Sequence, residues 1–503
     1  MTLLLEKPRS AIALMLATIG VLLASAAHAQ TSQSQTGRSP APDPRTLGVV
    51  FADEPLRLDE VGLSMPLPEG TVVQAATAGS SAAAQIIGPD GDWVLGISIP
   101  RAIADGQSAG VFSDRIIEQV QQANAEVRID GRGNEQLGPS RARLMERTAD
   151  LLVSGYDADR FVFRLPNLRR ETAELTRVYT VVHPGGRQFI VFELTCRPDN
   201  AAIARRITDT MIAATTIVDP VKLNLDRGKA VERGLLVLSQ LTMAELDAIA
   251  STEGDGTTST GGRWERLYRP GPTGDSTDDQ ELGYRRLQFR RGVRGELDRS
   301  KDPSRFSGIE LEEGLLVWME ARLLQPNNAV IDTAAELFVS ADGTRELWSV
   351  RMTPRAQGSE SGTYVELGVR DGRELEITVQ SPGATGRSIR PLIQGQGYLS
   401  QAHIALLGNL LVRAGLEGDF GFYGYRSSDQ RIRFRRDKVE RVPGPAELWR
   451  VSSTLADGMQ PQVSLYDNEG RFIRTDLDNG TRWERTSVEE LARLWRRKGL
   501  PLN

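Results

Sequence analysis

The chain has 503 residues, with 61 lysines and arginines against 66 aspartates and glutamates, which gives a net charge of −5. This length predicts two or more domains, and the mild acidity excludes a general nucleic-acid binder. One cysteine and three histidines exclude an internal disulfide and a zinc site built from clustered histidines and cysteines.

Residues 1–29 have the pattern of a secretory signal peptide. Lys7 and Arg9 precede an apolar run over Ala11–Ala26, and Ala27-His28-Ala29 gives the small-x-small pattern of a cleavage site. We expect cleavage after Ala29, which would place the mature chain in the periplasm or outside the cell. No later stretch reaches the roughly 18 apolar residues that a membrane span needs, so no transmembrane span is expected after cleavage.

Residues 30–48 are polar, contain three prolines and show no hydrophobic period, which predicts a disordered linker. Residues 49–219 have the pattern of one α+β domain, in which runs of alternating apolar residues surround segments with helical spacing. The expected elements are hairpins over 84–99 and 177–196, a helix over 111–124 and a closing helix that begins near Asn200.

Three segments of this domain carry a resemblance to a known fold. They are Pro66-Leu67-Pro68-Glu69-Gly70 near its start, the strand Trp93–Ile97, and the late strand Phe189–Cys196 before the last helix. With these segments the domain resembles the PsbP-like fold, which implies an antiparallel sheet sandwiched by helices. Members of that fold are mostly binding or assembly factors, so the resemblance implies a role other than catalysis.

Residues 220–260 predict a helical connector. Val231, Leu235 and Leu238 recur at helical spacing, and Thr242–Glu245 has the pattern of a capping box at the start of a second helix.

Residues 261–503 are dominated by strands. Apolar residues alternate with polar ones in several segments, among them 348–352 and 375–379, which predicts an antiparallel sheet with one face toward a core. By the same pattern Val365, Leu367 and Val369 are expected to face that core. The sequence Arg-Trp-Glu-Arg occurs at 263–266 and again at 482–485, which indicates either two similar half-sheets or chance.

The segment Ser400–Arg413 is apolar nearly all round, which predicts a helix that is buried on all sides. A last helix is expected over 487–497, because Ser487–Glu490 has the pattern of a capping box. The predicted fold class is α+β with two domains: an antiparallel sheet sandwiched by helices, then a large curved antiparallel sheet wrapped around an apolar helix.

In its strand meander and its apolar 400–413 segment, the second domain resembles the outer-membrane lipoprotein carriers. The resemblance implies a half-barrel sheet that holds acyl chains over an apolar helix. A groove of this kind would have an apolar lining, and the residues expected there are Val317, Met319, Trp348, Leu375, Ile377, Leu406 and Leu410. If these side chains instead pack against one another, the domain is a closed core.

Arginines gather on two strands. Arg431, Arg433 and Arg435 alternate and share one face, which suits a lipid headgroup or an acidic envelope protein, because guanidinium groups pair with phosphates and carboxylates. The alternative is a solvated face on which they pair with aspartate and glutamate. The other arginine-rich strand region contains Arg285, Arg286, Arg290, Arg291 and Arg294.

The segment Gly106–Gly110 matches the Gly-x-Ser-x-Gly pattern of serine hydrolases, with Ser108 as the nucleophile. That pattern needs a sharp turn from strand to helix, but Pro100–Asp105 intervene here. His183, in a hairpin turn, and His403, in the apolar helix, are the bases that the mature chain offers. A glycine-rich helix start is therefore favoured over a serine esterase.

No cofactor and no metal ion are expected. The acidic residues at 275–281 lack the ligand spacing and the glycine of a calcium loop. Cys196 lies in register with the apolar residues of its strand, which indicates a buried side chain rather than a reactive thiol.

Three functions remain open. The first is a non-enzymatic exported binding protein, like other bacterial exported proteins, that holds a lipid or another amphiphile in the curved sheet. The second is a two-domain scaffold or assembly factor that binds an envelope protein. The third is the esterase that uses Ser108.

Overall fold

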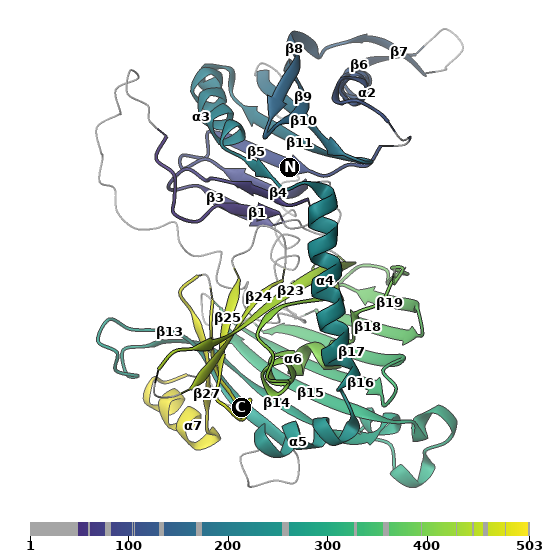
Figure 1. Ribbon diagram of the computed structural model, residues 1–503, viewed down its shortest axis with the longest axis vertical. Helices are drawn as coiled ribbons and strands as arrows, with labels where there is room; N and C mark the ends of the chain where they lie inside the picture. Colours follow the sequence, from purple (N-terminus) through teal and green to yellow (C-terminus); the bar gives the residue numbers. More distant parts are fainter. Residues whose placement is uncertain are drawn as a thin grey trace, which may run out of the picture. The chain divides into compact units, whose positions relative to one another are not determined.

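The computed structural model describes residues 49–500, apart from 59–60, 76–81, 103, 105, 130–134, 167–173, 254–260, 326–328, 356–361, 394, 429, 445–446, 456–460 and 478. The expected signal peptide (1–29) and linker (30–48) lie outside the described residues. The predicted α+β class is confirmed, since helices accompany extensive antiparallel sheets. The described residues divide into two compact units, 49–226 and 227–500 (Figure 1).

The first unit is built on a seven-stranded antiparallel sheet with the strand order β3-β4-β5-β11-β10-β9-β8. Its strands are β3 (Val72–Ala75), β4 (Ala82–Ile87), β5 (Trp93–Ser98), β8 (Arg143–Val153), β9 (Tyr156–Pro166), β10 (Glu174–Gly185) and β11 (Gln188–Cys196). Two smaller sheets consist of β1 (Leu56–Leu58), β2 (Leu63–Met65) and β12 (Thr216–Ile217), and of β6 (Ala125–Ile129) and β7 (Glu135–Ser140).

Both faces of the seven-stranded sheet are covered, because β11 is apolar on both sides. Phe192 faces a core that includes α3 (Ala201–Ala213), which follows the short 3-10 helix η3 (Pro198–Asn200). Phe189 faces a second core that includes α2 (Ala109–Ala123). The first unit is therefore a sheet with a helix packed on each face.

The second unit contains a 15-stranded sheet with the order β20-β19-β18-β17-β16-β15-β14-β13-β27-β26-β25-β24-β23-β22-β21. The pair β21–β22 is parallel, and the other neighbouring pairs are antiparallel. The strands of its first half are β13 (Gly261–Arg269), β14 (Gln280–Val293), β15 (Glu313–Leu324), β16 (Val330–Ser340), β17 (Arg345–Arg355), β18 (Tyr364–Asp371), β19 (Glu374–Gln380) and β20 (Arg387–Ile389). Those of its second half are β21 (Tyr398–Leu399), β22 (Gly418–Arg426), β23 (Arg431–Val442), β24 (Leu448–Thr454), β25 (Gln462–Tyr466), β26 (Phe472–Asp476) and β27 (Arg482–Thr486).

Helices precede, interrupt and follow this sheet. They are α4 (Pro220–Ser239), α5 (Met243–Glu253), α6 (Gln401–Arg413), α7 (Val488–Arg497) and the 3-10 helices η4 (Arg294–Leu297), η5 (Pro303–Arg305) and η6 (Gly308–Leu311). Within the described part of the chain no helix is by itself long and apolar enough to cross a membrane, and α4 with α5 passes that test only as a pair bent by 84°.

The strand order places the first and the last strand of the sheet side by side. β13 and β27 pair antiparallel, with Leu267 opposite Trp483. The two Arg-Trp-Glu-Arg segments, 263–266 and 482–485, therefore lie on neighbouring strands in the middle of the sheet, where the two halves meet.

The apolar 400–413 segment forms α6, and the sheet curves around it (Figure 1). Ser400 caps the helix by accepting a hydrogen bond from the His403 backbone N at 3.2 Å. The helix contacts β15 and β16 of the first half of the sheet and β22 and β25 of the second. Because it is enclosed in this way, Leu406 and Leu411 are completely buried.

The prediction that Val365, Leu367 and Val369 face the core is wrong. Leu367 and Val369 are 44% and 43% exposed, respectively. The alternate residues of β18 face inward and are buried, namely Tyr364, Glu366, Gly368 and Arg370.

A polar inward face is possible on β18 because distant residues satisfy it. Glu366 accepts hydrogen bonds from Ser427 Oγ at 2.8 Å, Tyr425 Oη at 3.2 Å and Trp348 Nε1 at 3.3 Å. Gly368 leaves room for Trp348, since a Cβ there would lie 2.0 Å from the indole Cζ2. Burial raises the pKa of Glu366 above its ordinary value, which these donors only partly oppose.

Candidate functional site

A pocket of about 130 Å³ lies in the second unit, between α6 and the part of the sheet formed by β13–β16 and β24–β27, with one residue from β23. Its polar lining residues are Arg263, Arg285, Arg435, Ser453, Gln462, Ser464, Tyr466 and Thr475. Its apolar lining residues include Leu287, Met319, Leu337, Ile404, Ala405, Val451, Leu455, Phe472, Leu477 and Trp483, and α6 adds Gly408. The pocket lining therefore combines cationic and hydrogen-bonding groups with apolar side chains.

Arg263 and Arg285 share the fully buried carboxylate of Glu265. Arg263 Nε donates to Glu265 Oε1 at 2.6 Å, and Arg285 Nε donates to Glu265 Oε2 at 2.8 Å. Burial works against the ionisation of Glu265, but the two guanidinium groups hold its pKa below the ordinary value. Both arginines also stack on aromatic rings of the lining, Arg263 on Phe472 and Arg285 on Trp483.

Arg435 reaches the pocket from β23. Its Nε and Nη2 donate to the two carboxylate oxygens of Asp437, each at 2.8 Å, and Asp437 is completely buried. Ser453 Oγ accepts from the same Nη2 at 3.2 Å. This bidentate pair fixes the guanidinium plane at the pocket wall.

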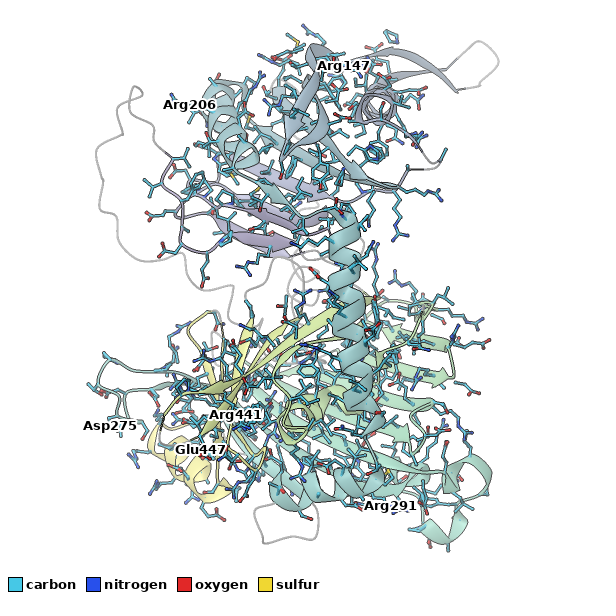
Figure 2. All side chains as sticks on the ribbon, in the orientation of Figure 1. Arg147, Arg206, Asp275, Arg291, Arg441 and Glu447 are labelled. Carbon is cyan, nitrogen blue, oxygen red and sulfur yellow. The ribbon has the colours of Figure 1, made fainter. Side chains whose placement is uncertain are left out.

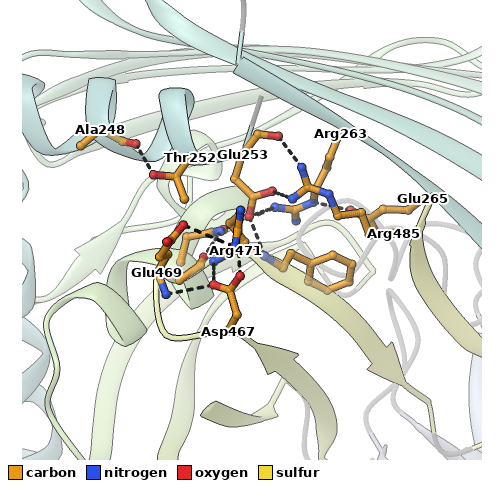
Figure 3. Close-up of polar contacts among 12 residues, drawn as sticks. Ala248, Thr252, Glu253, Arg263, Glu265, Asp467, Glu469, Arg471 and Arg485 are labelled. Atoms are coloured by element: carbon orange, nitrogen blue, oxygen red, sulfur yellow. Dashed lines mark hydrogen bonds and ion pairs between the residues drawn. The ribbon is translucent and has the colours of Figure 1, made fainter. Parts of the chain in front are cut away.

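Glu253, the last residue of α5, joins four elements behind this wall (Figure 3). Its carboxylate accepts hydrogen bonds from the backbone N of Phe472 and from Arg485 Nη1, both at 2.7 Å. Arg263 Nη1 lies 3.1 Å from the same carboxylate, and Asn409 of α6 donates to it as well. The network holds α5, α6, β13, β26 and β27 in one arrangement.

Tyr466 is the most enclosed hydroxyl donor of the lining, with 6% of the residue exposed. Its Oη lies against Gly408 so closely that a Cβ on residue 408 would be 1.9 Å away. Burial raises the pKa of Tyr466 to about 12, so the side chain is a neutral phenol at physiological pH. Among the described residues the phenol makes no hydrogen bond.

The seven residues predicted to line an apolar groove are buried together in one hydrophobic core. Met319 lines the pocket, whereas Val317, Trp348, Leu375, Ile377, Leu406 and Leu410 do not. The physical reason is that α6 fills the concave side of the sheet, so these side chains contact one another.

The structure does not keep the three predicted arginines of β23 in one environment. Arg435 lines the pocket, Arg433 is half-buried and Arg431 is exposed. Arg285, from the second arginine-rich strand, lines the pocket with Arg435.

Ser108 is the N-cap of α2 and accepts a hydrogen bond from the Val111 backbone N at 3.3 Å. His183 Nε2 lies 3.2 Å from the Gly186 carbonyl oxygen, and its ring stacks on Phe189. Neither histidine of the described chain hydrogen-bonds to Ser108. Cys196 is buried, and burial raises the pKa of its thiol to about 11.

Within the described ranges no group of three or more histidine, cysteine, aspartate or glutamate side chains could hold a metal ion. In the acidic 275–281 segment, Asp279 and Glu281 accept hydrogen bonds from Arg266 Nη2, each at 2.7 Å. Lys498 Nζ donates to Glu281 at 3.0 Å. These contacts join the segment to β13 and to the end of α7.

A second pocket, of about 360 Å³, lies against the other face of β14 and β15 and is lined by Trp318 and residues 296–306. Arg290 and Arg299 lie over the Trp318 ring, 5.2 and 5.3 Å from its centroid. Arg290 is paired with Glu296 and Lys301 with Glu310. This pocket is more open to solvent than the first, and its ion-paired side chains are 26–33% exposed, so it is the weaker candidate.

Tyr466, Gly408 and Arg263 were not predicted as site residues. Tyr466 and Gly408 stand in short segments without a distinctive motif. A signal did exist for Arg263, because the repeated Arg-Trp-Glu-Arg segments pair across β13 and β27, and both supply arginines to Glu253.

No family model matches the chain, and no curated protein matches it. Among solved structures, the cyanobacterial PsbP of Synechocystis is 17% identical over 34% of this chain and 99% of its own, with a TM-score of 0.23. A beta-barrel-like protein of a domain of unknown function from Brucella abortus is 11% identical over 45% of this chain and 96% of its own, with a TM-score of 0.28. Neither structure supports the resemblance to lipoprotein carriers, and both TM-scores are too low to define a family or a function.

Proposed function

We propose that this chain is a non-enzymatic, exported binding protein that takes a small amphiphile, or one end of a lipid, into the pocket beside α6. The observation that carries the proposal is that the pocket lining combines apolar side chains with cationic and hydrogen-bonding groups. Sites for small molecules also combine apolar surface with placed polar groups that fix the orientation of the ligand.

The size of the pocket limits the ligand. Pockets that enclose drug-sized molecules measure roughly 300–1,000 Å³, and this one measures about 130 Å³. A long acyl chain would not fit inside it. The pocket suits a small molecule or the terminal group of a longer one.

The hydroxyl groups of the lining favour binding over catalysis. Ser453 Oγ donates to the buried Asp437, and Ser464 Oγ and Thr475 Oγ1 lie 2.7 Å apart in a hydrogen bond. No histidine lines the described pocket to act as the base of a serine nucleophile. The lining therefore offers recognition groups without an activated nucleophile.

Isothermal titration calorimetry of the exported chain tests this proposal. The probes are benzoate, phenyl phosphate and the neutral benzamide, and at least one of them should bind with one-to-one stoichiometry. Ala405→Leu adds volume at the pocket wall and should abolish that binding, whereas Ala213→Leu, on the exposed end of α3, should leave it unchanged. Circular dichroism would establish that both variants are folded. Absence of binding by all three probes, or undiminished binding by a folded Ala405→Leu variant, would contradict the proposal.

A further inference from the structure

On the basis of the binding function proposed above, we infer that the ligand carries a carboxylate or phosphate group on a small apolar body. The juxtaposition that points to this ligand is that of Arg285, Arg435 and the hydroxyl of Tyr466, which makes no hydrogen bond to a described residue, around one pocket.

The ion-pair network beside the pocket contains more cations than carboxylates. Four guanidinium groups, those of Arg263, Arg285, Arg435 and Arg485, pair with three carboxylates, those of Glu253, Glu265 and Asp437, and the Arg485 side chain is 28% exposed. Each of these carboxylates is completely buried. A monoanionic ligand group in the pocket would equalise the charges, whereas a neutral or cationic group would not.

The arginines also retain donors for such a group. A guanidinium carries five N–H donors, and Arg285 uses its Nε and Nη2 for Glu265. Arg435 uses its Nε and Nη2 for Asp437 and Ser453. The Nη1 groups of both arginines have no acceptor among the described residues. Planar N–H pairs on fixed guanidinium groups match the oxygens of carboxylates and phosphates.

Tyr466 of β25 adds a neutral donor beside α6. Its hydroxyl makes no hydrogen bond to a described residue, so its O–H is available to an acceptor oxygen of a ligand. Gly408 makes this placement possible, because any side chain at residue 408 would overlap the phenol.

The volume and the apolar lining residues of the pocket limit the size of the apolar part of the ligand. An apolar cavity of about 150 Å³ in another protein binds benzene, and the present pocket is of that order. Trp483 and Phe472 supply aromatic surface there. An acid whose apolar part is about the size of benzene would therefore contact the apolar residues of the lining while its charged group meets the arginines.

The test compares the affinities of benzoate, phenyl phosphate and benzamide for the wild-type chain and three variants. Arg285→Gln equalises the charges and leaves Glu265 paired with Arg263, so it should remain folded. Tyr466→Phe removes only the hydroxyl. Arg441→Gln is the matched control, since Arg441 lies on β23 like Arg435 but its side chain is 68% exposed (Figure 2).

We expect at least one of the two anions to bind wild type ten-fold or more tightly than benzamide. Arg285→Gln and Tyr466→Phe should each weaken anion binding about ten-fold, as expected for a hydrogen bond to a charged group, and Arg441→Gln should not. Preference for benzoate assigns a carboxylate, and preference for phenyl phosphate assigns a phosphate.

Two results overturn the inference while leaving the proposed function standing. One is that benzamide binds the wild-type chain as tightly as the anions or more tightly, and that Ala405→Leu abolishes this binding. The other is wild-type anion affinity in folded Arg285→Gln and Tyr466→Phe variants. If no probe binds at all, the proposed function and the inference fail together.

Discussion

Replacing Glu253 by alanine is expected to destabilise the second unit severely. The substitution removes the acceptor for the Phe472 backbone N–H and one partner from each of Arg263 and Arg485. Arg263 keeps Glu265 and the Arg485 side chain is 28% exposed, but Arg263 and Phe472 are buried. Donors that lose their acceptor in such a place bear the full cost of desolvation.

The expected loss of stability follows from the burial of the Glu253–Arg263 ion pair. Removing one partner of a buried ion pair costs about 3–5 kcal/mol. For a unit of this size that corresponds to a decrease of roughly 6–20 °C in Tm. Glu253→Gln keeps an acceptor oxygen without the charge, so this variant should lose less stability than Glu253→Ala.

Urea unfolding followed by tryptophan fluorescence measures this effect, because six of the seven tryptophans lie in the second unit and only Trp93 lies in the first. Glu469→Ala is the control, since the Glu469 side chain is 66% exposed and 3.4 Å from Arg471 (Figure 3). An exposed pair contributes about 0–1 kcal/mol. If Glu253→Ala unfolds within 1 kcal/mol of wild type, the network does not hold the unit together.

Three further predictions concern single side chains. Gly368→Ala should cost about 1–3 kcal/mol or more by overpacking against Trp348. Gly386→Ala, where the nearest atom to a Cβ would be the Val379 carbonyl oxygen at 4.0 Å, should cost under about 0.5 kcal/mol in the same urea assay. Burial lowers the pKa of His403 to about 4, so unfolding should become easier as pH falls from about 6.5 toward 4; a His403→Gln variant with the same pH dependence would refute this. Ser108→Ala should weaken α2 by about 1 kcal/mol, seen as faster amide exchange in its first turn, and unchanged exchange would count against the capping role.

The buried helix was predictable because its signal is local. Ser400–Arg413 has too little polar surface to face water, and a serine cap marks its start, so both its burial and its bounds follow from a few neighbouring residues. The α+β class follows for the same reason, since hydrophobic periods are local patterns.

The orientation of β18 was not predictable from its own residues. Its alternation defines two faces, but the direction of each face depends on Ser427 and Tyr425, which lie about sixty residues further along the chain. Once these donors satisfy Glu366, the polar face can be buried and Leu367 exposed. A rule that places apolar residues inside fails where a polar network is complete.

The pocket was beyond sequence reasoning for a related reason. Arg263 and Tyr466 come from strands that are far apart in the chain. Arg263 lies in the repeated Arg-Trp-Glu-Arg segment, but that repeat does not by itself indicate a binding site, and Tyr466 lies in no motif. The expected groove residues were chosen for their apolarity, which selects residues of the packed core. A ligand site needs space and unused donors, and these depend on how distant strands meet.

The pairing of β13 with β27 has a consequence for how the chain is made. Tyr268 Oη donates to Glu484 Oε2 across 216 residues of intervening sequence. Contacts of such long range form slowly, because the closure of the intervening chain must come first. While this chain emerges from the ribosome, β13 can pair with β14 but lacks its other neighbour, β27, until synthesis is almost finished. A stop codon just before Arg482 would remove a strand from the centre of the sheet, so the truncated product would expose two unpaired strand edges to aggregation.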